Sequence, residues 1–128
     1  MPDRSKPTVL ERMTSDRGAV PVQFQIMAEH DPRYLELFHE TYMHVMEDND
    51  ALPRKIKELI LVAVDAATYY HYGTKFHMKA ALEYGATAQE VMTALTVAGV
   101  ACGIHVPSAA MPLLKEALDE REAADAAK

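Results

Sequence analysis

Two carboxylates interrupt an otherwise apolar stretch of the chain, and their positions suggest chemistry. Glu58 and Asp65 lie in the segment from Ile56 to Ala67, where the other side chains are aliphatic except for Lys57. Seven residues separate them, so on an α-helix they lie two turns apart on the same face. Burying a carboxylate is costly unless it is paired or hydrogen-bonded. Two interpretations therefore stay open: structural ion pairs, or a catalytic acid or base.

Aromatic side chains with polar tips follow this stretch, and a histidine follows them. The segment Tyr69–Gly73 reads YYHYG, and His77 comes four residues later. Tyrosines in such a cluster can either wall a core or line a pocket. A lone inward histidine is normally a hydrogen-bonded core residue. Because an acidic helix precedes His77 by one short turn, we also consider it a candidate functional residue.

Helices are predicted to hold all of these side chains. Apolar residues recur at three- and four-residue spacing, and no segment alternates with the period of two that a strand requires. Asp31-Pro32 is a helix start signal, and Thr87 with Glu90 forms a capping box. Gly85 is expected to end a helix. The expected helices cover residues 20–29, 31–47, a central helix from 53 toward Gly73, 74–84, 87–102, and a last helix around 113–118 that bends near Pro112.

The resulting fold prediction is an all-α bundle of about six helices. The central helix is apolar on nearly every side and is expected to be buried on nearly every side, by its own chain or by another subunit. Cys102 is expected on the buried side of its helix, and His39 and His44 on a solvated side. We expect residues 1–18 to form an arm with one helical turn, 19–122 the helical domain, and 123–128 a solvated tail.

The net charge, the apolar runs and the cysteine content indicate which kinds of partner and which cellular location to expect. The 128 residues fit one domain, and the net charge is −6 without a basic tract. This argues against nucleic acid or an anionic membrane as the main partner. The longest apolar runs are too short to span a bilayer. A single cysteine, Cys102, and no recognisable secretory signal favour a cytoplasmic location.

The stretch from the central helix onward resembles the carboxymuconolactone decarboxylase family, whose wider fold group includes the AhpD-type alkylhydroperoxidases. The resemblance covers roughly residues 35–115. It implies an AhpD-like helical fold and homo-oligomers, either trimers or hexamers. The residues that carry it are Lys57-Glu58-Leu59, Ala66, His77, Ala80-Ala81-Leu82, Gly85-Ala86-Thr87, Glu90 and Val91.

The peroxidase branch of that fold group carries a Cys-x-x-Cys pair, which this chain lacks. Aligned on His77, the two cysteine positions fall on Tyr70 and Gly73, and the glutamate of that branch falls on Glu58. Thiol–disulfide exchange needs an attacking thiolate and a resolving partner. The single cysteine excludes dithiol chemistry unless two subunits pair it. The decarboxylase branch, which needs no metal or organic cofactor, is the remaining resemblance.

This resemblance leads to a functional hypothesis. The protein would be a cofactor-independent lyase or isomerase acting on a small carboxylated lactone or keto acid. His77 would be the acid–base, and Glu58 would orient it or share its proton. The residues expected to contact substrate are Tyr70, His71, His105 and Asp65.

Two alternatives use the same fold. In the first, His71, His77, Glu58 and Asp65 converge on a zinc or iron ion, although their spacing matches no strong zinc motif. In the second, the chain is a non-catalytic oligomer that binds a small molecule. A pH-independent affinity between about pH 5 and 8 would favour this second alternative, since a functional histidine titrates in that range.

Overall fold

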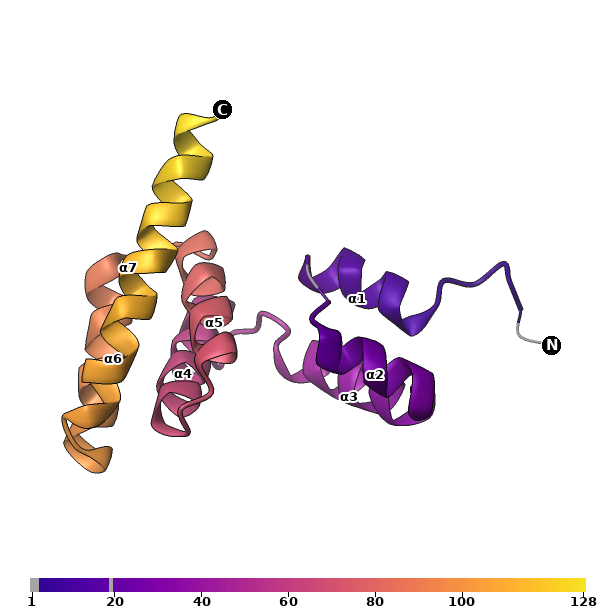
Figure 1. Ribbon diagram of the computed structural model, residues 1–128, viewed down its shortest axis with the longest axis horizontal. Helices are drawn as coiled ribbons and strands as arrows, with labels where there is room; N and C mark the ends of the chain where they lie inside the picture. Colours follow the sequence, from indigo (N-terminus) through magenta and orange to yellow (C-terminus); the bar gives the residue numbers. More distant parts are fainter. Residues whose placement is uncertain (1–2, 19) are drawn as a thin grey trace. The chain divides into compact units, whose positions relative to one another are not determined.

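The computed structural model describes residues 3–18 and 20–128, and within them the chain is all-helical, with no strand. The fold class is therefore as predicted. Seven helices are present in this part of the chain instead of about six (Figure 1). They are α1 (Val9–Arg17), α2 (Val22–His30), α3 (Pro32–Val45), α4 (Arg54–Ala67), α5 (His71–Glu83), α6 (Ala88–Cys102) and α7 (His105–Ala126).

The helices form two compact units, of which the first ends at Glu47 and contains α1, α2 and α3. Its small core consists of Val9 and Met13 from α1 and Leu35 from α3. The prediction of one helical turn near the N-terminus was too short, because α1 has nine residues. Its start is a capping box in which Thr8 and Glu11 satisfy each other's backbone N–H groups, a signal present in the sequence.

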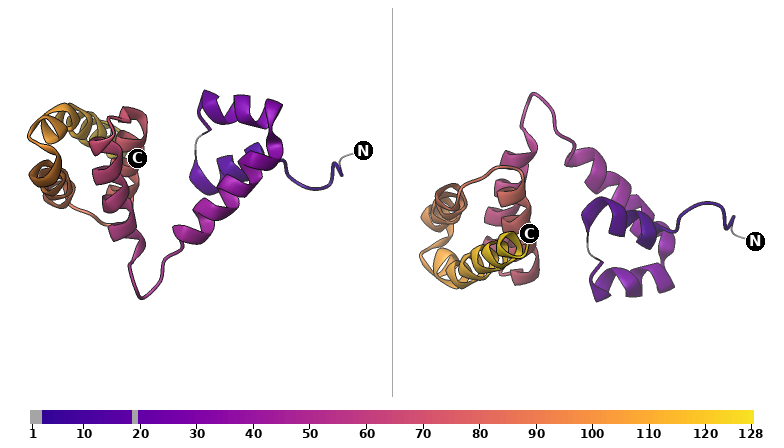
Figure 2. Two further views of the ribbon diagram at one scale, coloured as in Figure 1. Left: turned by 90° about the horizontal axis from the view of Figure 1, so that it is seen from below. Right: turned by 90° about the horizontal axis from the view of Figure 1, so that it is seen from above.

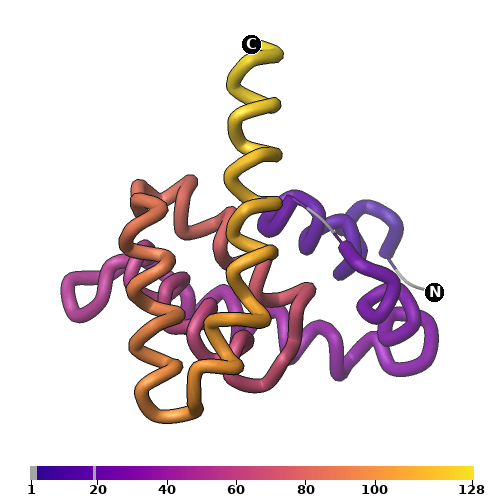
Figure 3. Tube along the Cα trace, turned by 60° about the vertical axis from the view of Figure 1, so that its left-hand side comes forward, coloured from indigo at the N-terminus to yellow at the C-terminus, as the bar shows by residue number. Residues whose placement is uncertain are grey.

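The second unit, Asp48–Lys128, contains α4 to α7 arranged as a ring of neighbours. α4 packs on α5 and α6, and α7 packs on the same two helices from the other side. Figure 2 shows the four helices around a common centre. The end of α7 extends beyond the other helices of the unit, as Figure 3 shows. The buried core residues are Val62, Ala66, Met78, Ala81, Leu82, Ala86, Val91, Leu95, Val106, Ala110, Leu114 and Ala117.

Local sequence signals set several helix ends as predicted. The Asp31 side chain accepts a hydrogen bond from the Tyr34 backbone N–H at 3.1 Å, and Pro32 is the first residue of α3. Thr87 and Glu90 form both bonds of a capping box at the start of α6. Gly85 follows the end of α5 with φ +95°, a left-handed conformation that glycine adopts without steric cost.

Within the single chain, Ile60 and Val64 of α4 are 46% and 51% exposed, so burial of this side of the central helix by another subunit stays a prediction. Two other predictions about burial were wrong. Cys102 is exposed. His39 is buried, because it is hydrogen-bonded to Asp16 on α1, with 2.8 Å between Nε2 and Oδ2.

The ends of α5 and α7 also differ from the prediction. α5 begins at His71, within the stretch that was expected to break the helix, because the turn preceding it needs only three residues. α7 begins at His105, contains Pro112 and continues to Ala126, so the expected tail is largely helical, although exposed. No helix in the described residues is long and apolar enough to span a membrane.

Candidate active site

Glu58 and His77 meet inside the second unit. The distance from His77 Nδ1 to Glu58 Oε2 is 2.6 Å. Glu58 is 0% exposed and His77 is 7% exposed, so the contact is shielded from bulk water. A carboxylate can only accept a hydrogen bond. This contact therefore places the proton on Nδ1 and leaves Nε2 as the ring nitrogen that can exchange a proton with another group.

Arg54 binds the other oxygen of Glu58. Its Nε donates to Glu58 Oε1 at 2.8 Å, one helical turn earlier on α4. The Arg54 guanidinium lies 4.9 Å from the centre of the Tyr84 ring, a cation–π contact that covers it further. Both oxygens of the buried carboxylate are thus engaged. This satisfies the condition under which a buried charge is tolerated.

Asp65 lies on the opposite side of the imidazole. Its Oδ2 is 3.8 Å from His77 Nε2, close enough for an ion pair but too long for a direct hydrogen bond. Burial raises the pKa of the Asp65 carboxyl, and the charge of His77 partly opposes that rise. His77 is therefore flanked by two carboxylates from one helix, with a short contact at Nδ1 and a longer one at Nε2.

Gly73 provides the space for this arrangement. A β-carbon at this position would fall far inside van der Waals contact with Asp65 Oδ2, and 2.6 Å from the Tyr70 ring carbon Cδ1. Aromatic rings cover the neighbourhood, since Tyr72 contacts both Tyr70 and Phe76. The Phe76 ring meets His77 edge-on, with 5.1 Å between ring centres. Only glycine leaves room for the Asp65 carboxylate here.

A tight turn joins the two helices that supply the site. Tyr69 has φ +57°, the left-handed conformation that is uncommon for a non-glycine residue. The Tyr70 backbone N–H then donates to the Asp65 carbonyl at 2.9 Å, which closes the end of α4. The turn reverses the chain, so α5 packs along α4 and His77 reaches the level of Glu58.

Comparison with known proteins identifies the family. The model of the carboxymuconolactone decarboxylase family matches residues 32–116, which is most of the chain. The chain belongs to this family. Its fold is also similar to the crystal structure of a protein from Burkholderia xenovorans LB400 that is provisionally named a carboxymuconolactone decarboxylase. That match has a TM-score of 0.76 and 24% identity, and covers 89% of this chain and 90% of the other. No curated protein matches the chain.

The structure brings together three of the six predicted site residues of this family member. Glu58, His77 and Asp65 form the cluster described above. Tyr70 lies beside it over Gly73, and His71 is exposed at the first residue of α5. His105 is exposed at the start of α7, and no described hydrogen bond or ion pair joins it to the cluster.

Sequence reasoning missed Arg54 and Tyr84 as members of the site. The spacing of Arg54 and Glu58, four residues apart on a helix, is a signal that could have indicated the ion pair. The contact of Arg54 with Tyr84 joins the start of α4 to the end of α5, and no local sequence pattern indicates it. Within residues 3–18 and 20–128, no group of three or more His, Cys, Asp or Glu side chains is arranged to hold a metal ion.

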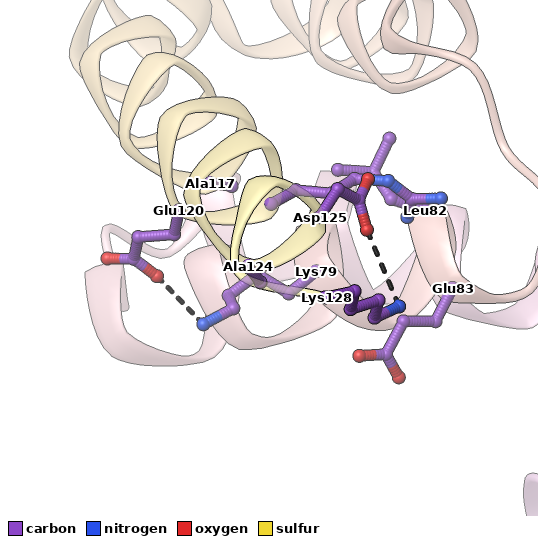
Figure 4. A pocket seen from close by; sticks show the side chains of 9 residues that line it. Lys79, Leu82, Glu83, Ala117, Glu120, Ala124, Asp125 and Lys128 are labelled. Atoms are coloured by element: carbon purple, nitrogen blue, oxygen red, sulfur yellow. Dashed lines mark hydrogen bonds and ion pairs between the residues drawn. The ribbon is translucent and has the colours of Figure 1, made fainter.

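Two cavities in this unit lie elsewhere. One, of about 390 Å³, lies between α5 and α7 and is lined mainly by charged side chains, including Lys79, Glu120 and Asp125 (Figure 4). The other is an open groove of about 410 Å³ between α4 and α6, lined mainly by apolar side chains, including Ile60, Ala63 and Val97. Neither cavity is lined by Glu58, Asp65 or His77.

Proposed function

We propose that this member of the carboxymuconolactone decarboxylase family is a cofactor-independent carboxy-lyase or isomerase, with His77 as its general acid–base. The observation that supports this most directly is the 2.6 Å contact between His77 and the buried carboxylate of Glu58. The substrate class is a small carboxylated lactone or keto acid, in line with the family name. In this proposal Tyr70, His71 and His105 remain candidate substrate contacts.

The reaction class fits the chemistry of the cluster. Loss of CO₂ next to a carbonyl leaves an enolate, and an acid must then deliver a proton to carbon. Glu58 fixes the Nδ1–H tautomer of His77 through the 2.6 Å contact, and Nε2 remains the nitrogen that can exchange a proton with the substrate. Arg54 positions Glu58 through its hydrogen bond to Oε1. Burying this chain of charged contacts is costly, and a role in proton transfer would explain why the site keeps it.

His77→Gln tests the proposal. A panel of lactones and keto acids is first screened for turnover by the wild-type protein. The substitution removes the titrating group and is expected to lower kcat by a factor of about 10²–10⁴, the contribution typical of general acid–base catalysis. His44→Gln is the matched control, because His44 is exposed on α3. Undiminished turnover by His77→Gln would disprove the acid–base role.

The assembly of the protein is part of the same proposal. We infer that the groove between α4 and α6 receives a second copy of the chain, giving a homo-oligomer. Ile60 of α4 and Val97 of α6 are exposed and line the same apolar groove, and Val64 and Val100 of these two helices are exposed as well. Isolated monomers rarely expose a large apolar patch. A trimer or hexamer is the expected size. A cytoplasmic location, favoured by the single cysteine, belongs to this proposal as well.

A further inference from the structure

Asp65 is the least explained member of the cluster. Its carboxylate belongs to α4 and is only 19% exposed at the side chain, yet it makes no short hydrogen bond to His77. The 3.8 Å between Asp65 Oδ2 and His77 Nε2 suits a loose ion pair but is too long for a direct hydrogen bond. An oxygen atom beside the line that joins these two atoms can lie about 2.8 Å from each, which is hydrogen-bond distance. The two side chains can therefore share one oxygen atom as a hydrogen-bond partner.

The space around Asp65 depends on the residue opposite it. Any side chain at position 73 would overlap Asp65 Oδ2, as well as the Tyr70 ring. Gly73 is in the first turn of α5 with no positive φ, so its backbone conformation is open to any residue. Glycine is thus needed here for space and not for conformation. The position of the Asp65 carboxylate beside the imidazole therefore depends on glycine at 73, and a methyl group there would displace it.

The charged groups around His77 are few in the described part of the chain. α4 supplies Glu58 and Asp65, and Arg54 acts through Glu58. The neighbouring ring on α5 is the apolar Phe76. In the described part of the chain, both ion pairs of His77 are made with carboxylates of α4. Asp65 is therefore the charged side chain that faces the nitrogen left free for proton exchange.

We propose that Asp65 is the second proton-carrying group of the site, and that Asp65 Oδ2 and His77 Nε2 together bind one oxygen atom of the substrate. Gly73 leaves the space that the Asp65 carboxylate occupies. This role of Asp65 deepens the proposed function and rests on it. The oxygen is that of the substrate carbonyl that becomes an enolate. Burial raises the pKa of Asp65, which favours the protonated form that such an oxygen requires.

The proton balance of the step is complete without another reactant. When the carbon–carbon bond to the carboxylate breaks, CO₂ leaves and the electron pair passes to the carbonyl oxygen, which takes the Asp65 proton. The enol then returns that proton to Asp65 while carbon takes a proton from His77 Nε2. Solvent reprotonates His77. One proton is consumed for each CO₂ released, and both side chains end in their starting states.

The first experiment measures the His77 imidazole titration by NMR and needs no substrate. The resonance is assigned by its loss in His77→Gln. Because Asp65 Oδ2 lies 3.8 Å from Nε2, the His77 ring signals are expected to shift when Asp65 takes up its proton as the pH is lowered, and this step should be absent in Asp65→Asn. Gly73→Ala should displace the carboxylate and weaken or remove the same step.

A double-variant cycle separates Asp65 from Tyr70. If Gly73→Ala acts by displacing Asp65, then Asp65→Asn/Gly73→Ala titrates like Asp65→Asn alone. If the alanine acts through the Tyr70 ring, its effect persists in the Asp65→Asn background, and the role of Gly73 is overturned. Glu83→Gln, an exposed carboxylate on α5, is the matched control and should leave the titration unchanged. Should Gly73→Ala fail to fold, Asp65→Asn decides alone, and an unchanged titration overturns the proposal.

Turnover distinguishes this inference from the proposed function. Asp65→Asn is expected to lower kcat by a factor of about 10² or more, because the amide cannot transfer the proton. Loss of turnover in His77→Gln with full turnover in Asp65→Asn would overturn the role of Asp65 and keep that of His77. Full turnover in His77→Gln would overturn the proposed function itself, whatever the titration of His77 shows.

Discussion

At the residue scale, Glu58 is the side chain that connects the charged residues of the site. It accepts from Arg54 at one oxygen and contacts His77 at the other, while fully buried. Glu58→Gln keeps the volume but replaces one acceptor by an NH₂ group, so either Arg54 or His77 loses its partner. Breaking a buried ion pair on one side costs about 3–5 kcal/mol. We expect a loss of that order in the free energy of unfolding, measured by urea titration.

The control for Glu58→Gln is a solvent-exposed ion pair that has the same i,i+4 spacing as Arg54 and Glu58. Lys115 and Asp119 form an i,i+4 pair on α7, and both side chains are exposed. Asp119→Asn should cost no more than about 0.5 kcal/mol, because exposed pairs are screened by water. Equal losses in the free energy of unfolding for the two substitutions would show that burial does not strengthen the contribution of the Glu58 ion pair.

Asp65 is expected to lower stability near neutral pH. Burial raises its pKa, so the folded state binds the proton more tightly than the unfolded state and the ionised form is destabilising. This cost is present above the raised pKa and disappears as the pH falls below the ordinary value of 3.8. Asp65→Asn should therefore have a higher Tm than the wild type at pH 7, and the difference should shrink toward pH 3.5.

Thermal unfolding at several pH values checks this expectation. Asp50→Asn, in an exposed loop, should leave the Tm profile unchanged. A lower Tm for Asp65→Asn at pH 7 would show that Asp65 stabilises the fold and would assign it a structural role. A rise in stability with a loss of turnover would instead be the trade-off typical of functional residues.

The sequence predicted the contact between Glu58 and His77 but not the room around Asp65. Helical spacing places the two carboxylates on one face, and a short turn brings His77 back to that face, so the pairing follows from local rules. The overlap between a β-carbon at 73 and Asp65 depends on the distance between α4 and α5. Spacing along the chain contains no information about that distance. The contact between Arg54 and Tyr84 was not predicted for the same reason, because it also depends on how α4 and α5 pack.

At the element scale, a cluster of charges joins α5 to α7. Glu120 contacts Lys75 at 2.5 Å and Lys79 at 2.7 Å, and these two lysines lower the pKa of Glu120 to about 2. A lowered carboxylate pKa contributes stability that is present above the ordinary value of 4.5 and is lost as the pH falls through about 2. Because the cluster is exposed, the contribution is small and sensitive to salt.

Glu120→Gln tests this link between the helices. The substitution should lower the free energy of unfolding at pH 7, and the difference from the wild type should disappear near pH 2. Raising the salt concentration at pH 7 should also reduce the difference. Glu122→Gln, a neighbouring exposed carboxylate on α7, is the control. An undiminished difference at pH 2 would contradict the assigned ionisation.

The starts and ends of helices were easier to predict from sequence than the burial of side chains. Asp31, Thr87 and Gly85 act through hydrogen bonds or backbone conformations within a few residues, so their sequence patterns are sufficient. His39 was predicted on a solvated side, but it is buried by its bond to Asp16, a residue 23 positions away. Cys102 was predicted inward, but the last turn of α6 exposes it. Both errors concern contacts between elements.

At the scale of the whole molecule, the exposed apolar side of α4 leads to a prediction about assembly. Ile60→Asp places a charge in the groove between α4 and α6, and burying it against a second copy would be costly. We expect sedimentation at micromolar concentration to show a shift from oligomer toward the 14.2 kDa chain. Ile26→Asp is the control, since Ile26 is similarly exposed on α2. A wild type that sediments only as a monomer would contradict the proposed assembly.

The crowding between positions 65 and 73 also limits which sequences can share this site. A side chain gained at 73 meets the carboxylate at 65, and a shorter residue at 65 would free that space. In relatives of this chain the two positions are therefore expected to change together, with a bulky residue at one and a small residue at the other. A descendant could acquire a thiol at 73 only after, or together with, the loss of the aspartate, so this mutational path must pass through position 65.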